Sequence, residues 1–211
     1  MERIKTSVQF MNARKKGLLM NTTSVSQTAD KSAFLERIFP FLVQRGLENV
    51  SIRELCKGTG IVQGSLYYWF GDKTNIVCEA TEYGLKKVTK EIFEYVLANA
   101  GGLRGLFSGC LDKVDHYKDE LRFIYQMAAS PFYGETVREL GKNVDAVYDR
   151  CTNQLAEQLG CDAQNLRPLV YLFISAVLDY AVWDEREKSQ MQLEFIYSAL
   201  SERLAAEKVL H

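Results

Sequence analysis

Apolar side chains recur every three or four residues along most of this chain, which is the period at which an α-helix buries one face. The pattern becomes regular after residue 30, where its first apolar positions are Phe34, Leu35, Ile38 and Leu42. Apolar and polar residues alternate in no sustained stretch, so strands are not expected. The sequence therefore predicts an all-α fold.

Helical periodicity continues to the end of the chain, with short breaks between segments. The breaks read NAGG, SPFYG, LGCD and DERE, and glycine, proline and aspartate are residues at which helices end or begin. We predict long helices at residues 73–99, 103–117, 119–130, 134–159, 163–183 and 186–208. Residues 170–183 are apolar on nearly every side, so other helices must cover most of that segment.

The first helical segment contains one stop signal and one irregularity. Gly46 follows the last periodic residues and is placed to cap the C-terminus of that helix. Pro40 lies inside the segment and has no N–H to donate to the carbonyl of Glu36, so a kink is expected there.

A short second helix is predicted from its capping residues. Ser51 and Glu54 have the S-x-x-E spacing of a capping box, in which each residue satisfies a free N–H group of the other. Gly58 and Gly60 are expected to end this helix. A tight turn should follow.

A third helix, equally short, is predicted near residues 63–70, ending at Gly71, and Asp72 is placed to cap the long helix that begins at about Lys73. At 100° per residue, one arc of this helix carries Leu66, Tyr67 and Phe70, and the opposite arc carries Ser65, Tyr68 and Trp69. One arc can therefore pack inward while the other faces outward. The helix would be about 12 Å long, comparable to the major groove of B-DNA. Two short helices joined by a glycine-containing turn form a helix-turn-helix, whose second helix reads that groove.

Charge is distributed unevenly along the 211 residues. Residues 1–80 hold eleven basic and seven acidic residues, whereas residues 81–211 hold fifteen and twenty, for a net charge of −1 overall. A basic front and an acidic back fit a polyanion-binding unit joined to a body with another task.

Residues 1–30 show no sustained period and end in a Ser/Thr-rich stretch, so a flexible tail is expected. Its ARKK motif is compatible with a basic arm that reaches DNA. A solvated tail, or an over-long start with the initiator at Met11 or Met20, is the simpler interpretation. The sequence leaves these alternatives open.

The residues that carry redox, metal or enzyme chemistry form no recognisable constellation. The five cysteines form no C-x-x-C pair, and the two histidines lie far apart. Reduced thiols are the main expectation, ahead of a redox-sensing cysteine and a structural metal. No E-x-x-H pair, P-loop or G-x-S-x-G is present. We expect neither enzyme activity nor a cofactor. No signal-peptide stretch is seen at the N-terminus and no apolar run approaches the length of a membrane helix, so a cytoplasmic protein without membrane contact is expected.

The stretch SIRELCKGTGIVQGSLYYWFGDKTNI resembles the DNA-binding module of TetR-family transcriptional regulators. The resemblance covers about residues 31–78 and is a pattern of many positions, among them Ser51-Ile52-Arg53, Gly60, Gly64-Ser65-Leu66-Tyr67-Tyr68, Phe70 and Lys73. Over residues 79–211 only the layout is similar. The resemblance implies a three-helix helix-turn-helix domain at 31–78 and a helical bundle at 79–211 that binds a ligand and dimerises.

The resemblance also implies DNA contacts at Ser51, Arg53, Gln63, Gly64, Ser65, Tyr68, Trp69 and Lys73. Ser51 or Arg53 and Lys73 would meet phosphates, and Gly64 with Ser65 would allow close approach. Tyr68 would donate its hydroxyl to the DNA backbone or pack against a sugar. Leu66, Tyr67 and Phe70 would lie in the core. The family often has Ser or Thr where Val62 stands, a basic or small polar residue at Gln63 and His at Trp69. Gln63 can instead pair with adenine, and Trp69 can contact a thymine methyl.

Within the body, the resemblance implies an effector site and a dimer interface. Candidate ligand-facing residues are Phe107, Cys110, Tyr125, Met127, Tyr148 and Phe173, although aromatic residues at helical spacing usually just pack. Candidate dimer residues are Leu172, Ala176, Tyr180 and Trp183 in one stripe, with Met191, Phe195 and Leu200 opposite. Asp179 lies within the apolar run and needs a partner or a wet interface. A dimer interface is its first interpretation and a ligand contact its second.

These observations predict a homodimeric regulator, in the first place a repressor, that binds palindromic operator DNA and is released by a small-molecule effector. The alternative is a DNA-binding regulator triggered by cysteine oxidation or by a protein partner. The sequence specifies neither the effector nor the operator, the target genes or the sign of regulation.

Overall fold

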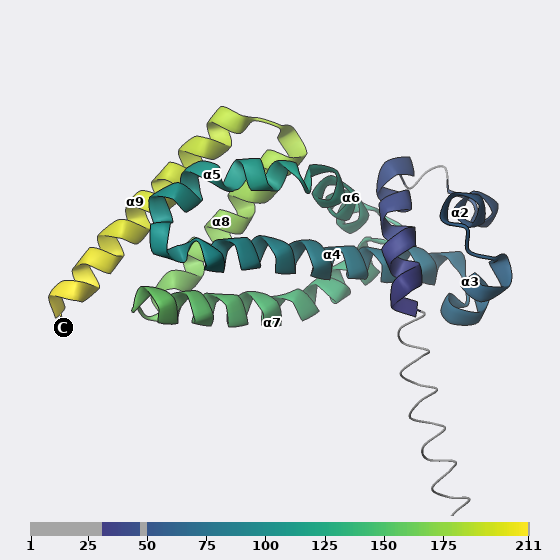
Figure 1. The fold of residues 1–211 in the computed structure, drawn as a ribbon, viewed down its shortest axis with the longest axis horizontal. Coiled ribbons are helices and arrows are strands. Elements are labelled where there is room, and N and C mark those ends of the chain that lie inside the picture. The colour runs from purple at the N-terminus through teal and green to yellow at the C-terminus, as the bar shows by residue number, and fades with distance from the viewer. Residues whose placement is uncertain (1–30, 47–49, 211) are drawn as a thin grey trace, which may run out of the picture.

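The structure, a computed structural model, describes residues 31–46 and 50–210, and all regular structure in these residues is helical (Figure 1). The predicted tail at residues 1–30 lies outside the described residues. Residues 31–45 form the first helix, in which Pro40 is included. The other elements are α2 (Ile52–Thr59), α3 (Gln63–Phe70), α4 (Lys73–Ala98), the short 3₁₀ helix η1 (Ala100–Gly102), α5 (Leu103–Asp115), α6 (Lys118–Ala129), α7 (Gly134–Leu159), α8 (Ala163–Trp183) and α9 (Arg186–Leu210).

The all-α prediction is confirmed, and the helix ends follow from local capping chemistry. The Ser51 hydroxyl accepts a hydrogen bond from the Glu54 N–H at 3.2 Å, and the Glu54 carboxylate accepts one from the Ser51 N–H at 2.8 Å. This is the predicted capping box. Gly60 has a φ of 66° and donates its N–H to the Cys56 carbonyl, and Asp72 accepts from the Asn75 N–H at the start of α4.

Gly58 has a different role from the predicted one. It lies inside α2, and a Cβ at this position would lie 1.9 Å from the Phe41 ring of the first helix. The glycine therefore allows two helices to touch, whereas Gly60 alone ends α2. Gly84 in α4 is contacted in the same way, because a Cβ there would lie 2.1 Å from the Phe39 ring.

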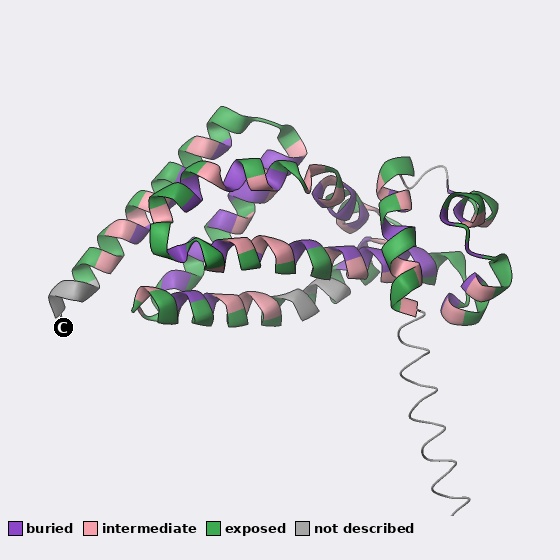
Figure 2. Ribbon diagram, in the orientation of Figure 1, coloured by how far each residue is buried: buried purple, intermediate pink, exposed green. Residues whose placement is uncertain are grey.

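Two hydrophobic clusters divide the molecule. The head cluster joins the first helix, α2, α3 and the start of α4 with Phe123, Ile124 and Met127 of α6 and Val137 of α7. The body cluster joins the rest of α4 with α5, α7, α8 and α9. Figure 1 shows α4 running from the short helices α2 and α3 into the body beside α7, and Figure 2 shows buried positions along it. With 26 residues, α4 is about 39 Å long and connects both clusters.

The apolar helix α8 crosses the body and packs against α5, α6, α7 and α9. Its 21 residues have the length and the mean hydropathy, 1.4 over the best window, of a membrane-crossing helix. This differs from the expectation that no segment approaches that length. Its contacts with four other helices are those of a core helix in a helical bundle.

Candidate DNA-binding surface and candidate effector cavity

Helix α3 is held in place by hydrogen bonds on both sides. The Arg37 guanidinium of the first helix donates to the Thr59 carbonyl in the turn before α3. The Thr59 hydroxyl donates to the Leu55 carbonyl at 2.7 Å. After α3, the Asn75 side chain donates to the Phe70 carbonyl at 3.0 Å. These contacts fix the turn before α3 and the corner after it, so the direction of the helix is set by its neighbours.

The outer surface of α3 exposes more aromatic area than the sequence predicts. Leu66 and Phe70 are buried in the head cluster, as expected, and Tyr68 is 72% exposed. Tyr67 is 43% exposed, so its prediction as a core residue is wrong. A helix of two turns that packs along one edge buries only the pair at i and i+4. Trp69 is half-buried against the head cluster, and its ring meets that of Tyr68 edge-on at 5.2 Å.

The N-terminal turn of α3 is open. Gln63 and Gly64 are exposed and Ser65 is half-buried. A Cβ added at Gly64 would meet no atom of the protein within 4 Å. The fold of the chain itself therefore does not require a glycine here, in contrast to Gly58.

The predicted phosphate contacts at the starts of α2 and α4 differ in availability. Arg53 and Lys73 are exposed. The Ser51 hydroxyl is already engaged by Glu54, to whose carboxylate it donates at 2.7 Å. Hydrogen bonds from the Ser51 side chain and backbone hold the pKa of Glu54 below its ordinary value, so this carboxylate stays ionised beside the α2 N-terminus.

Most of the net positive charge of residues 1–80 comes from residues 1–30. Residues 1–30 contain five basic and two acidic residues, whereas residues 31–80 contain six and five. The helix-turn-helix is therefore close to neutral.

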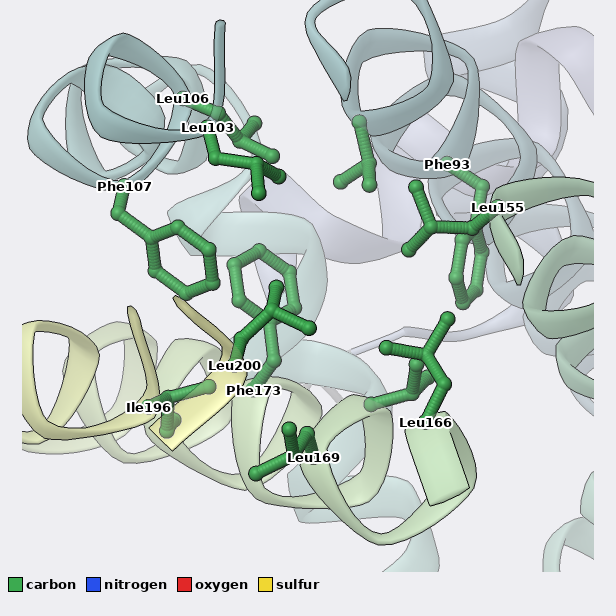
Figure 3. Close-up of a pocket in the computed structure, with 12 residues that line it drawn as sticks. Phe93, Leu103, Leu106, Phe107, Leu155, Leu166, Leu169, Phe173, Ile196 and Leu200 are labelled. Carbon is green, nitrogen blue, oxygen red and sulfur yellow. The ribbon is translucent and has the colours of Figure 1, made fainter. Parts of the chain in front are cut away.

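Two apolar cavities lie in the body. The larger, of about 170 Å³, lies between α4, α6, α7 and α8. The smaller, of about 30 Å³, is lined entirely by hydrocarbon side chains, which Figure 3 shows converging from several helices. Of the predicted ligand-facing residues, Tyr125 and Tyr148 line the larger cavity, Phe107 the smaller and Phe173 both. Cys110 and Met127 line neither, because Cys110 packs in the body cluster and Met127 faces the head cluster.

Helices α8 and α9 share an exposed groove. Leu172 and Ala176 of α8 and Met191 and Phe195 of α9 line it, and Met191 and Phe195 are each about two-thirds exposed. Trp183 is also exposed. Asp179 has the partner that it needs, because its carboxylate lies 3.3 Å from the Lys188 ammonium at the groove.

Tyr180 and Leu200, predicted on the dimer surface, instead face the interior. Tyr180 is buried, and its hydroxyl donates to the Asp115 carboxylate at 2.7 Å. Arg186 pairs with the same carboxylate at 3.1 Å, and the Lys118 ammonium lies 4.0 Å from the centre of the Tyr180 ring. This cluster fastens the α5–α6 corner to the α8–α9 corner. Leu200 is buried in the body cluster.

The described residues give little support for a metal site or a reactive thiol. They contain no group of three His, Cys, Asp or Glu side chains that would hold a metal ion. Burial raises the pKa of the Cys110 thiol to about 12 and also raises the pKa of Cys78 and Cys151. Thiols with raised pKa values are poor nucleophiles at neutral pH.

Comparisons with known proteins agree with the geometry of the helix-turn-helix. Residues 41–80 match the profile of bacterial regulatory proteins of the tetR family. The chain is 28% identical over 99 residues to the "HTH-type transcriptional repressor KstR2" of two strains of Mycobacterium tuberculosis. The match covers 46% of this chain and 49% of that repressor, so the chain spans about half the length of the curated relatives it matches. No solved structure matches the chain. The matched residues form a helix-turn-helix whose second helix is exposed, so in this unit the chain is similar to the TetR family of transcriptional regulators.

Proposed function

We propose that this protein is a cytoplasmic, homodimeric repressor that binds palindromic operator DNA through α3 and leaves it when an effector enters the body. The observation that carries the proposal is the exposed surface of α3, where Tyr68 and the unobstructed Gly64 lie on a helix fixed by its neighbours. A backbone without a Cβ can approach DNA closely. In this proposal residues 31–78 form the DNA-binding domain and residues 79–211 the effector-binding and dimerisation domain.

A dimer is proposed because one short helix contacts few base pairs, and a palindrome requires two copies about 34 Å apart. The groove on α8 and α9 supplies a largely apolar surface against which a second copy would pack. A two-fold interface on these helices would place their four copies in one bundle. Phe195 would lie near its centre.

Helix α6 supports the proposed release mechanism because its two faces serve the two regions. Phe123 and Met127 pack in the head cluster, and the Phe123 ring meets the Phe39 ring of the first helix at 6.0 Å. Leu121 and Tyr125 line the larger cavity. A molecule that displaces α6 would therefore move a support of the helix-turn-helix. Such a molecule releases DNA only if it binds the two states with different affinities.

DNA binding is tested by selecting preferred duplexes from a random pool and then measuring affinity for the selected sequence. Lys73→Ala is expected to lower the salt slope by about one. Tyr68→Phe is expected to weaken binding by about two- to tenfold, the usual worth of one hydrogen bond. The matched control is Tyr125→Phe, which removes a hydroxyl from the body. Failure of the purified protein to bind any duplex at low salt would refute the proposal.

The dimer is tested by sedimentation of Phe195→Glu, which places a charge in the groove. Monomers are expected, together with loss of operator binding. Phe132→Glu is the control, because Phe132 is equally exposed but lies in the turn between α6 and α7. An unchanged dimer in Phe195→Glu would place the interface elsewhere.

Release by cysteine oxidation is the second candidate, and the raised pKa values of Cys78, Cys110 and Cys151 weigh against it. Operator binding that falls after peroxide treatment and recovers after reduction would favour this trigger over a metabolite. Release by a protein partner remains a further alternative, and no feature of the described residues favours it.

A further inference from the structure

The two cavities of the body share a wall made of two aromatic rings. Among the residues that the structure describes, Phe93 of α4 and Phe173 of α8 line both cavities. Phe93 contacts Tyr148 at 5.5 Å between ring centres, and Phe173 contacts Phe107 at 5.8 Å. Figure 3 shows the Phe173 ring beside the Phe107 ring at the edge of the smaller cavity. A rotation of these side chains would therefore join the two spaces into one.

The lining of both cavities excludes an ionised ligand group. None of the described residues that line them is charged, and those of the smaller cavity have hydrocarbon side chains alone. A carboxylate, phosphate or ammonium placed there would lose its hydration without gaining a counter-ion. The molecule that fits is uncharged within the cavities.

One spot in the larger cavity offers hydrogen bonds. Thr89 of α4 and Tyr148 of α7 both line it, and each carries a hydroxyl group. Burial raises the pKa of Tyr148, so this phenol stays neutral. Tyr125 also lines the cavity but is half-exposed, which marks the side open to solvent. One ligand hydroxyl or carbonyl can therefore be bound at the Thr89–Tyr148 pair.

The size of the spaces indicates an extended occupant. A volume of about 170 Å³ is close to that of an engineered cavity that holds benzene, about 150 Å³. Ligand pockets usually measure about 300–1,000 Å³. Reaching that range requires displacement of the Phe93–Phe173 wall and use of the smaller cavity as well.

We propose that the effector is an uncharged, extended, mainly hydrocarbon molecule with one hydrogen-bonding group. Its polar end binds Thr89 and Tyr148, and its tail passes between Phe93 and Phe173 into the smaller cavity. The inference rests on the proposed function, because this molecule acts as an effector only if the protein is a DNA-binding repressor that it releases from DNA.

The tail is tested with straight-chain primary alcohols of increasing length, titrated calorimetrically into the full chain. Affinity is expected to rise about fourfold per methylene, the equivalent of burying one CH₂ group, until both cavities are filled. In Val170→Phe the affinity should stop rising at a shorter alcohol, because Val170 lines only the smaller cavity and the larger side chain would fill it. Phe173→Leu makes the shared wall smaller, so the affinity should continue to rise to a longer alcohol. This variant provides the test if Val170→Phe does not fold. If affinity stops rising at the same alcohol length in the wild type and in Phe173→Leu, the proposal that Phe173 separates the two cavities is wrong.

The polar end is tested at a fixed chain length. Tyr148→Phe should weaken the binding of decanol by about two- to tenfold and leave the binding of the matching alkyl chloride unchanged. The control is Tyr171→Phe, which should change neither, because Tyr171 is partly exposed and lines neither cavity. Decanoate should bind more weakly than decanol at neutral pH. Equal binding of the acid and the alcohol would place the head group outside the cavity and overturn the assignment.

Failure of this inference and failure of the proposed function give different results. A protein that binds its selected duplex but no alcohol is a regulator with another ligand class, and the inference is then wrong. A protein that binds alcohols with the expected length dependence but no duplex has the cavity without the DNA-binding function. Alcohols that bind and leave the duplex bound would show a ligand site that is not the effector site.

Discussion

The head and the body of this protein are packed in opposite ways. In the head, rings of the first helix lie directly on glycines, Phe41 on Gly58 and Phe39 on Gly84, with no room for a methyl group. In the body, larger side chains meet around a cavity of about 170 Å³. Close packing resists deformation, whereas a cavity lowers the cost of local rearrangement. The difference indicates a rigid head and a more deformable body, joined by α4 and α6.

The largest expected effect is on the tight side of this comparison. Gly84→Ala would force a methyl group against the buried Phe39 ring and should destabilise the protein by about 1–3 kcal/mol, as overpacking does. Urea unfolding followed by far-UV circular dichroism measures the change. Gly105→Ala, in a helix with open space around it, is the control and should not be destabilising. Equal midpoints for the two variants would mean that Phe39 moves aside freely.

A single substitution made at two places on α4 contrasts head and body directly. Val88→Ile adds a methyl group toward the larger cavity and should stabilise the protein by about 0.8 kcal/mol. Val77→Ile adds the same group to the head cluster and should destabilise it by about 1 kcal/mol. Thermal unfolding of both variants gives the comparison. Shifts of the same sign would show that the two regions are packed alike.

The short helices of the head also depend on their caps. Ser51→Ala removes the one hydroxyl that accepts from the Glu54 N–H and donates to the Glu54 carboxylate, and should cost about 1 kcal/mol of unfolding free energy. Ser51→Thr retains a capping hydroxyl and should restore most of this loss. Denaturant unfolding of the three proteins tests the expectation, which fails if alanine and threonine behave alike.

The smallest effect on stability is expected at Gly64, where one substitution should change DNA affinity without lowering the free energy of unfolding. Gly64→Ala meets open space inside α3 and should leave stability unchanged or raise it by about 0.5–1 kcal/mol, because alanine favours the helix. DNA affinity should nevertheless fall, since the methyl group would face the duplex. Thermal unfolding and duplex titration of the same preparation measure both quantities. Unchanged affinity would place Gly64 away from DNA.

Local chemistry made most helix ends predictable. The Ser51–Glu54 capping box, the Asp72 cap and the left-handed Gly60 depend on residues within a few positions of each other, and all three were visible in the sequence. The predicted bounds of α3, α7 and α8 agree with the structure, and the other long helices differ by at most two residues at an end.

Side chains that depend on distant partners were not predictable in the same way. Tyr180 fits the apolar stripe of α8, but its hydroxyl is drawn inward by Asp115, 65 residues earlier. Gly84 carried no signal in the sequence, because the ring that requires it belongs to Phe39, on another helix. The exposure of Tyr67 follows from how little of α3 the other helices cover. Helical periodicity assigns faces to a helix but does not say which neighbour covers them.

The two-sided packing of α6 has a consequence for how the preference for the proposed effector can change over time. A substitution at Ile124 alters the cavity lining and the head cluster together, so a new preference gained there also disturbs the DNA-binding unit. Tyr148 and Ile174 reach the same cavity from α7 and α8 and belong to the body cluster. New ligand preferences should therefore arise mainly by change on those two helices, while α6 stays constrained.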